Sequence, residues 1–241
     1  MTLRGRLGRQ INLNTSYVWA KALNNASPIE TTLPRSSYGP SSLDLRERFV
    51  LSGLFALPTT THFGAFGREV LDGWRVNDIT YIQSGTEYTV SSDTDENDDG
   101  VSNDRPNIIA NPYNTAATNR QQKIHQYLNP AAFQSVTAAV AKTLVPCLCA
   151  FFGNEERNGL HLPYTSATNL SLFKEFALPR STRLQFRLEA FNAFNKVNLQ
   201  DPRTDLATLQ SPTNEGNTTG FYQIQEAQNP RQIQLGARFL F

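Results

Sequence analysis

The feature that most constrains this chain is a strict alternation of apolar and polar residues. Over the last ten residues every second side chain is apolar, and the positions between them are polar or glycine except for Leu240. Successive side chains of a strand point to opposite faces, so this pattern predicts a strand with one apolar and one polar face. The same period recurs at 184–190, 49–57 and 11–19. Strands of this kind separate two different environments.

Six segments of the chain carry this period. We expect long strands at about 9–22, 44–57, 73–90, 166–176, 182–195 and 231–241. In the third segment the apolar phase changes near Asn77–Asp78, which predicts a β-bulge at that point. The best candidate for an amphipathic helix, 119–134, is short and polar.

The connections between these segments alternate between long and short. Long connections cover 23–43, 91–165 and 196–230, whereas shorter ones cover 58–72 and 177–181. Outer-membrane barrels have short turns on the periplasmic side and longer loops outside, and a spanning strand needs about 9–11 residues. The sequence therefore predicts an all-β fold. We expect an antiparallel meander of about six long strands, forming part of an outer-membrane transporter β-barrel with long external loops.

The average composition hides this pattern. Hydrophobic residues make up 39% of the chain, charged residues 18%, and the mean hydropathy of −0.42 is typical of a soluble domain. No apolar run is long enough for a membrane-spanning helix, and a net charge of +1 provides no electrostatic footprint for nucleic acid. Two alternatives stay open. One is a soluble carbohydrate-binding β-sandwich, and the other is a small closed outer-membrane barrel with two further strands inside 91–165.

The sequence contains no recognisable catalytic motif. His62, His125 and His161 are scattered, and the chain has no HExxH, GxSxG, phosphate-binding glycine loop or CxxC. Cys147 and Cys149 stand in one Cys-Leu-Cys, too close for an ordinary disulfide and without partners for a structural zinc site. We therefore expect no enzymatic activity and no organic cofactor.

Eight blocks, in order over nearly the whole chain, carry a family resemblance. They are Ser16–Ala22, Leu45–Leu57, Gly73–Trp74, Asp98–Asn107, Asn129–Phe133, Asn169–Phe176, Leu184–Asn195 and Asn229–Phe241. Together they resemble the C-terminal barrel region of a TonB-dependent outer-membrane receptor, in the Oar-like branch with a carboxypeptidase-regulatory-type domain. The resemblance implies a location in the outer membrane, contact with lipid, and energy-driven uptake of a solute. It also implies that the barrel-assembly machinery recognises the terminal aromatic strand, with Phe239 and Phe241 as the assembly signal.

The family pattern extends beyond this chain. Its members carry a signal peptide, a plug domain, a segment that contacts TonB and about 22 strands. Residues 1–10 are basic but lack the apolar region of a secretory signal, so we expect either a cytoplasmic protein or a natural start elsewhere. The smallest single-chain barrels have eight strands. We therefore interpret 1–241 as a C-terminal segment of a receptor that does not transport alone. Its partner would be the remainder of the receptor, and TonB would act only through the missing plug.

The sharpest local motif is an acidic run in the predicted external loop. Asp95, Asn97 and Asp99 offer oxygen ligands at alternate positions before a glycine, as in the first half of a calcium loop. The twelfth position is Pro106 instead of a bidentate glutamate, although Asp104 could substitute for it. The sequence thus suggests a Ca²⁺ site, with a solvated acidic loop as the alternative.

Five charged residues belong to the polar faces of the predicted strands. They are Arg46, Arg48, Arg187, Glu189 and Arg238. If the apolar faces meet lipid, these residues face the barrel lumen. They either line a permeation path, contact a plug, or form a polar ladder along the wall.

Overall fold

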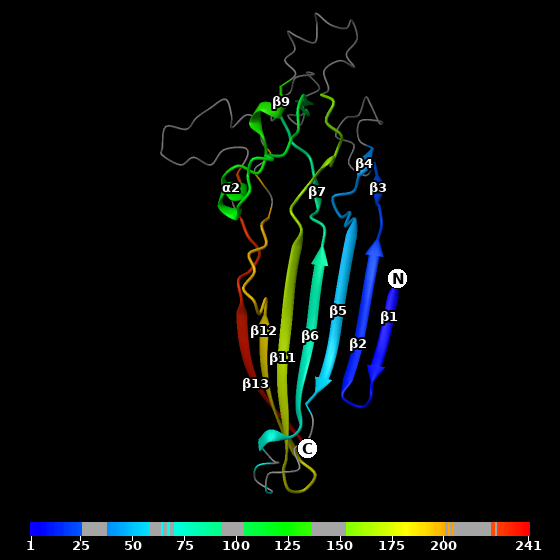
Figure 1. Cartoon of the computed structure of the whole chain (residues 1–241), viewed down its shortest axis with the longest axis vertical. Coiled ribbons are helices and arrows are strands. Elements are labelled where there is room, and N and C mark those ends of the chain that lie inside the picture. Colours follow the sequence, from blue (N-terminus) through cyan, green and yellow to red (C-terminus); the bar gives the residue numbers. More distant parts are fainter. Residues whose placement is uncertain are drawn as a thin grey trace, which may run out of the picture.

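The computed structural model describes residues 1–25, 38–57, 64, 67, 70–92, 104–135, 153–200, 202, 204, 223–224 and 226–241. These residues form one long antiparallel sheet with a group of short elements at one end (Figure 1). The strand order is β1-β2-β5-β6-β11-β12-β13, a meander. The strands are β1 (Thr2–Leu7), β2 (Ile11–Trp19), β5 (Glu47–Ala56), β6 (Trp74–Gln83), β11 (Thr165–Ala177), β12 (Arg183–Phe191) and β13 (Gln232–Leu240). The predicted all-β meander is confirmed.

The six predicted strands are all present, and β1 precedes them as a strand that the sequence reasoning missed. β1 pairs with β2 over its 6 residues. Gly8 in the turn between them has φ of 60°, a left-handed conformation that favours glycine. The apolar positions of β1 are Leu3, Gly5 and Leu7, so glycine removes the central apolar side chain. Too little of the alternation remains to mark a strand.

The predicted bulge near Asn77–Asp78 is wrong, because β6 pairs without interruption with both β5 and β11. The change of phase has another consequence. It turns Asp78 and Thr80 toward the face that carries the apolar residues of the neighbouring strands. Thr80 Oγ1 donates to Asp78 Oδ1 at 3.1 Å and lies 3.0 Å from Thr168 Oγ1. Local hydrogen bonds thus satisfy polar groups that a straight strand places on an apolar face.

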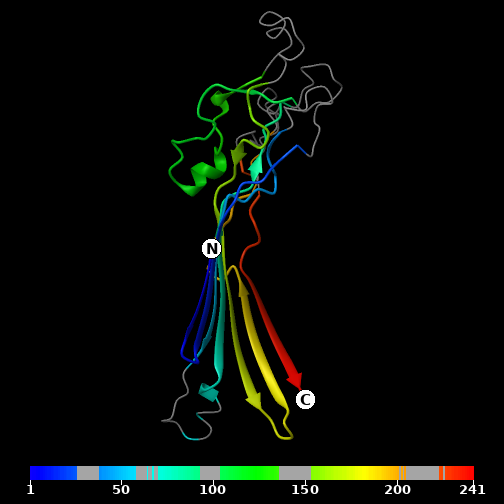
Figure 2. The same ribbon diagram turned by 90° about the vertical axis from the view of Figure 1, so that its right-hand side faces the viewer.

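Long and short connections lie at opposite ends of the sheet, as predicted. The links β1–β2, β5–β6 and β11–β12 lie at the end where the C-terminus is found, and the other three lie at the opposite end (Figure 1). Seen from the side, the sheet is curved, and its two outer edges diverge toward the C-terminal end (Figure 2). The sheet does not close, so β1 and β13 are edge strands.

The short elements at the other end form a unit that we call the loop cap, residues 84–92, 104–135 and 153–164. It contains β7 (Glu87–Tyr88), β8 (Asn107–Ile108), α2 (Arg120–His125), η1 (Pro130–Ala132), β9 (Phe133–Gln134) and β10 (Leu160–His161). Its core consists of Val90, Leu128, Ala132, Phe133 and Leu160. The two-residue strands β3 (Leu23–Asn24) and β4 (Gly39–Pro40) pair with each other at the same end of the molecule.

The described part of the predicted external loop contains no further long strand, since its strands have 2 residues each. The helix candidate at 119–134 reduces to α2 and the single turn η1. Asn119 caps α2 by accepting from Gln122 N at 2.9 Å, and α2 buries none of its residues. Over the described residues, no helix has both the length and the apolarity needed to cross a membrane.

Candidate functional site

The register divides the side chains of the sheet between two faces. Leu172 lies opposite Val76 and Leu188, and Leu188 lies opposite Leu235, so an apolar row crosses four strands. Directly opposed residues of an antiparallel pair share a face. We call this side the apolar face and the other side the polar face. The apolar face is open, and Leu235 is 82% exposed.

On the polar face of β11 and β12, the charged side chains are paired. Arg75 Nη1 and Arg183 Nη1 lie 3.8 and 3.9 Å from the carboxylate of Glu175. Arg187 Nη1 lies 3.6 Å from Glu189 Oε1, so the structure brings these two predicted residues together. Exposed pairs of this kind contribute little stability each. The arrangement is a polar ladder along the wall.

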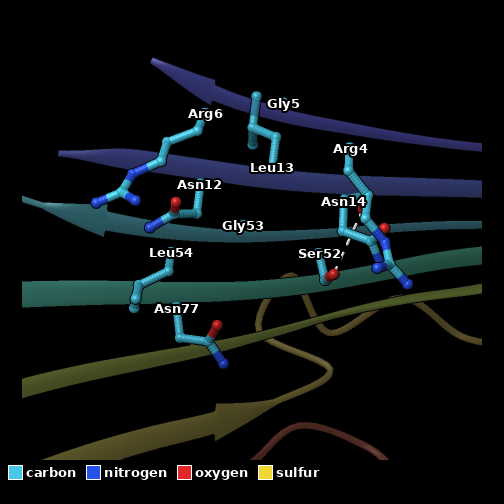
Figure 3. A pocket seen from close by; sticks show the side chains of 10 residues that line it. All are labelled: Arg4, Gly5, Arg6, Asn12, Leu13, Asn14, Ser52, Gly53, Leu54 and Asn77. Atoms are coloured by element: carbon cyan, nitrogen blue, oxygen red, sulfur yellow. Dashed lines mark hydrogen bonds between the residues drawn. The ribbon is translucent and has the colours of Figure 1, made fainter. Parts of the chain in front are cut away.

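On the polar face of β1, β2 and β5, the arginines are unpaired. A hollow of about 450 Å³ opens there, and Arg4 and Arg6 line it beside Asn12 and Asn14 (Figure 3). Within the described part of the chain, neither arginine forms an ion pair, nor does Arg48. Guanidinium and amide groups can bind carboxylate or phosphate oxygens. The sequence analysis missed Arg4 and Arg6 together with β1, although they alternate with Leu3 and Leu7.

A family model described as outer membrane beta barrel domain matches residues 1–234 of the chain. The chain belongs to this outer membrane β-barrel family. No curated protein and no solved structure is detectably similar to it. Family membership places the protein in the outer membrane, as predicted. It rules out the soluble carbohydrate-binding β-sandwich, in agreement with the single long sheet.

Four of the five predicted charged residues lie on the polar face of this barrel domain. Besides Arg187 and Glu189, they include Arg48, which lies opposite Gln83, and Arg238, which lies opposite Gln185. The polar face therefore combines a paired ladder on one side with unpaired arginines on the other. That this face lines a lumen stays a prediction.

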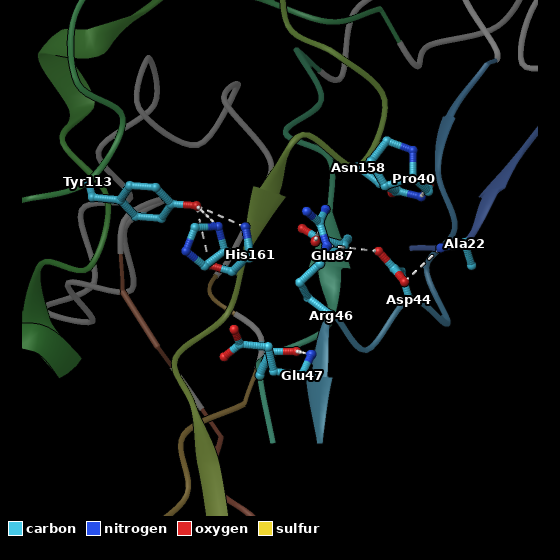
Figure 4. A network of polar contacts seen from close by, with 10 residues as sticks. Ala22, Pro40, Asp44, Arg46, Glu47, Glu87, Tyr113, Asn158 and His161 are labelled. Carbon is cyan, nitrogen blue, oxygen red and sulfur yellow. Dashed lines mark hydrogen bonds and ion pairs between the residues drawn. The ribbon is translucent and has the colours of Figure 1, made fainter. Parts of the chain in front are cut away.

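Arg46 differs from the other four because it precedes β5 and contacts the loop end of the barrel domain. Its Nε lies 3.7 Å from Asp44 Oδ2, and its Nη2 lies 3.8 Å from Glu87 Oε1 (Figure 4). Asp44 Oδ1 also accepts a hydrogen bond from Ala22 N at 2.9 Å. Burial raises the pKa of Glu87, although the nearby Arg46 opposes that shift. Arg46 therefore links the sheet to β7 of the loop cap.

A second group of contacts holds β10 in place beside this network. Tyr113 Oη accepts from His161 N at 2.8 Å and lies 3.0 Å from His161 Nδ1 (Figure 4). Tyr127 Oη donates to the His161 carbonyl at 2.9 Å. Burial and the positive charge of Arg46 lower the pKa of His161, so the neutral ring is favoured. These contacts are structural links within the barrel domain's loop cap.

The calcium hypothesis stays a prediction. Asp95, Asn97 and Asp99 lie outside the described residues, whereas Asp104 is buried. The Asp104 carbonyl accepts hydrogen bonds from Ser92 N at 2.7 Å and from Ser92 Oγ at 2.8 Å. The described residues contain no group of three His, Cys, Asp or Glu side chains able to hold a metal ion.

The remaining residues singled out in the sequence are dispersed. Phe239 lies on β13 opposite Leu184, on the apolar face, and Phe241 follows that strand fully exposed. His125 is on α2, far along the chain from His161 on β10. The positions outside the described residues are His62, Cys147 and Cys149.

Proposed function

We propose that this barrel domain forms the C-terminal part of the barrel of a TonB-dependent receptor, which takes up a solute across the outer membrane. The observation that carries the proposal is the open, curved sheet with edge strands β1 and β13. Hydrocarbon does not tolerate unpaired strand edges, because their amide and carbonyl groups have no water to bind. Further strands of the same receptor would pair with both edges and close the barrel.

The two faces of the sheet support this assignment. The apolar face exposes large side chains, among them Ile233, Leu235 and Phe239, that are costly to leave in water. We infer that it meets lipid. The polar face carries the ladder and the unpaired arginines, which suit a water-filled or plug-filled lumen.

The loop cap supports a receptor role. Its own apolar core holds it at the end of the sheet that carries the long connections, where external loops of a barrel lie. A structured external region can recognise a solute before it enters the barrel. The connection to TonB itself rests on the sequence resemblance of the ordered blocks.

A small barrel closed by β1 and β13 is the second candidate. The curvature of the sheet favours it, because curvature is a step toward closure. Seven strands are fewer than the eight of the smallest bacterial single-chain barrels, and those have even numbers of strands. We therefore favour the larger receptor.

The two candidates can be separated by expression in a Gram-negative host. One strain produces the chain behind a signal peptide, and a second produces it from its complete coding region. We measure the amount in the outer-membrane fraction and the shift in electrophoretic mobility on heating, which reports a closed barrel. The second product is also cross-linked to TonB.

The receptor proposal predicts that the chain alone aggregates. It also predicts that the complete product contains a plug, shows a heat-dependent shift, and cross-links to TonB. A heat-dependent shift of the chain alone would overturn the proposal in favour of the small barrel. A complete coding region without a plug would overturn it as well.

A further inference from the structure

A second hollow of about 440 Å³ lies on the polar face, where β6, β11 and β12 reach the external loops. We call it the amide hollow. Its lining contains no lysine, arginine, aspartate or glutamate among the described residues. Amide side chains and two aromatic rings dominate it, unlike the arginine-lined hollow over β1 and β2.

Two buried asparagines build the walls of the amide hollow, and their side chains are fully engaged. Asn198 accepts from Ser166 N at 3.0 Å and donates to Ser166 O at 2.9 Å. Asn192 accepts from Lys196 N and donates to Lys196 O, both at 2.9 Å. Each bond involves a main-chain group, so the pair fixes the path of the chain after β12 against β11. The hollow therefore has a defined wall.

Other amide groups in the same lining are not used within the protein. The side chains of Gln200, Gln228, Asn229 and Gln232 make no hydrogen bond to the described part of the chain. Main-chain bonds nevertheless hold the first two in place. Gln200 N donates to Glu226 O at 3.0 Å, and Gln228 N donates to Asn198 O at 2.8 Å. Held in place in this way, these amides offer both donors and acceptors to a ligand.

The aromatic residues flank the hollow from two strands. Tyr81 comes from β6 and Phe191 from β12, and β11 between them contributes the small residue Ala167. Ala167 lies directly opposite Tyr81 and is buried. A small residue between two rings leaves room for a flat group.

We propose that the amide hollow binds a neutral, polyhydroxylated ligand, namely an oligosaccharide. Each hydroxyl group donates and accepts, which matches an amide side chain, and the C–H face of a sugar ring packs on an aromatic ring. Without a charged residue in the lining, an anionic or cationic ligand would lose its hydration without gaining a partner. This inference rests on the proposed receptor function and names its substrate class.

The test uses the protein produced from its complete coding region and purified in detergent from outer membranes. Maltoheptaose, xylohexaose and inorganic phosphate are each titrated by calorimetry at 0.05 and 0.5 M NaCl. We expect at least one of the two oligosaccharides to bind with an affinity that salt leaves unchanged, because no ion pair is involved.

Two variants examine the hollow itself. Gln228→Ala should weaken binding about tenfold through lost hydrogen bonds, and Phe191→Leu should weaken it by a similar factor through lost ring contact. Asn14→Ala, an amide of the arginine-lined hollow on the same face, is the matched control and should bind like the wild type. All three variants must retain the wild-type level in the outer membrane.

The inference is overturned if neither oligosaccharide binds. It is also overturned if phosphate binds in their place, or if Asn14→Ala weakens binding as much as Gln228→Ala. These outcomes are separate from failure of the receptor proposal, which is decided by membrane insertion and cross-linking to TonB. Sugar binding by a barrel without a plug would leave the inference intact and remove only the TonB connection.

Discussion

The loop cap buries its apolar side chains, whereas the long sheet exposes those of one face. Leu128 in the cap is fully buried, but Leu235 on β13 is 82% exposed. The cap has the core of a small water-soluble unit, and the sheet has no second layer over its apolar face among the described residues. One chain thus contains two ways of removing apolar surface from water. The cap does it by packing, and we propose that the sheet does it by contact with lipid.

The largest test of this comparison places a charge on the apolar face. Phe186→Arg should remove most of the assembled protein from the outer membrane, because a cation near the bilayer midplane costs about 2–4 kcal/mol. Phe186 is 48% exposed and lies opposite Lys174 and Ala237. The measurement is the heat-dependent mobility shift of the outer-membrane fraction.

The neighbouring residue Arg187 provides the control. It lies on the polar face, so Arg187→Ala should cost only the exposed pair with Glu189, less than about 1 kcal/mol. Equal loss of assembly from the two variants would show that the faces have been assigned incorrectly.

The next largest effect is expected in the core of the cap. Leu128→Ala should destabilise the cap by about 2–5 kcal/mol, since it leaves a cavity in a closed core. Hydrogen exchange should then quicken in β8, β9 and β10 but not in the long strands. Leu235→Ala serves as the comparison and should leave the exchange of the cap unchanged. If both variants accelerated exchange in the cap equally, the cap would not be an independent core.

A smaller effect is expected from the buried carboxyl group of Glu155 in the cap. Burial raises the pKa of Glu155 to about 8, although Val90 N donates to its Oε1 at 2.8 Å. A raised pKa means that the native state binds a proton more tightly than the unfolded state. This stabilisation is complete below the unfolded pKa of about 4.5 and is lost as the pH rises through about 8.

Glu155→Gln stays neutral at every pH, so its cap should not lose stability over that range. We expect variant and wild type to exchange alike at pH 5 and the variant to be better protected at pH 8.5. Comparison of the two proteins at each pH cancels the intrinsic effect of pH on exchange. Parallel pH profiles would contradict a buried, protonated Glu155.

The smallest effect concerns Asp78, the acidic residue on the apolar face. Asp78→Leu should raise the stability of the assembled barrel by up to about 1 kcal/mol, because acidic side chains at lipid-facing positions carry a moderate cost. Thr80 keeps Thr168 as a partner at 3.0 Å. Urea titration in detergent measures the change. A loss as large as that of Phe186→Arg would mean that a polar partner, not lipid, covers this part of the face.

Much of the sheet could be predicted because a period of two is a local property. Strands β2, β5, β6, β11, β12 and β13 each carry enough apolar residues in phase to mark themselves. Strand β1 does not, since Gly5 interrupts its apolar face and the strand is short. The predicted bulge failed for a related reason. A change of phase in sequence can mean an extra residue, or it can mean that Asp78 simply lies on the apolar face, and only the pairing of β5 and β11 decides between them.

The sites were less predictable than the strands. Arg187 and Glu189 are two residues apart, so a strand alone places them on the same face. Arg46 fits the same pattern as Arg48 but lies outside the strand and contacts Asp44 and Glu87. The amide hollow joins residues of β6 to residues after β12, more than 100 positions apart in the sequence. No local pattern could have brought them together.

The sequence by itself determined the class of this protein. Alternation and the order of long and short connections require only neighbouring residues, and they led to an antiparallel outer-membrane sheet with structured external loops. The tertiary structure alone decided which arginines are paired, where Asp78 lies, and that the cap has its own core. These features depend on contacts between distant segments, whose free energies are set by packing, register and burial, and such contacts leave no period in the sequence.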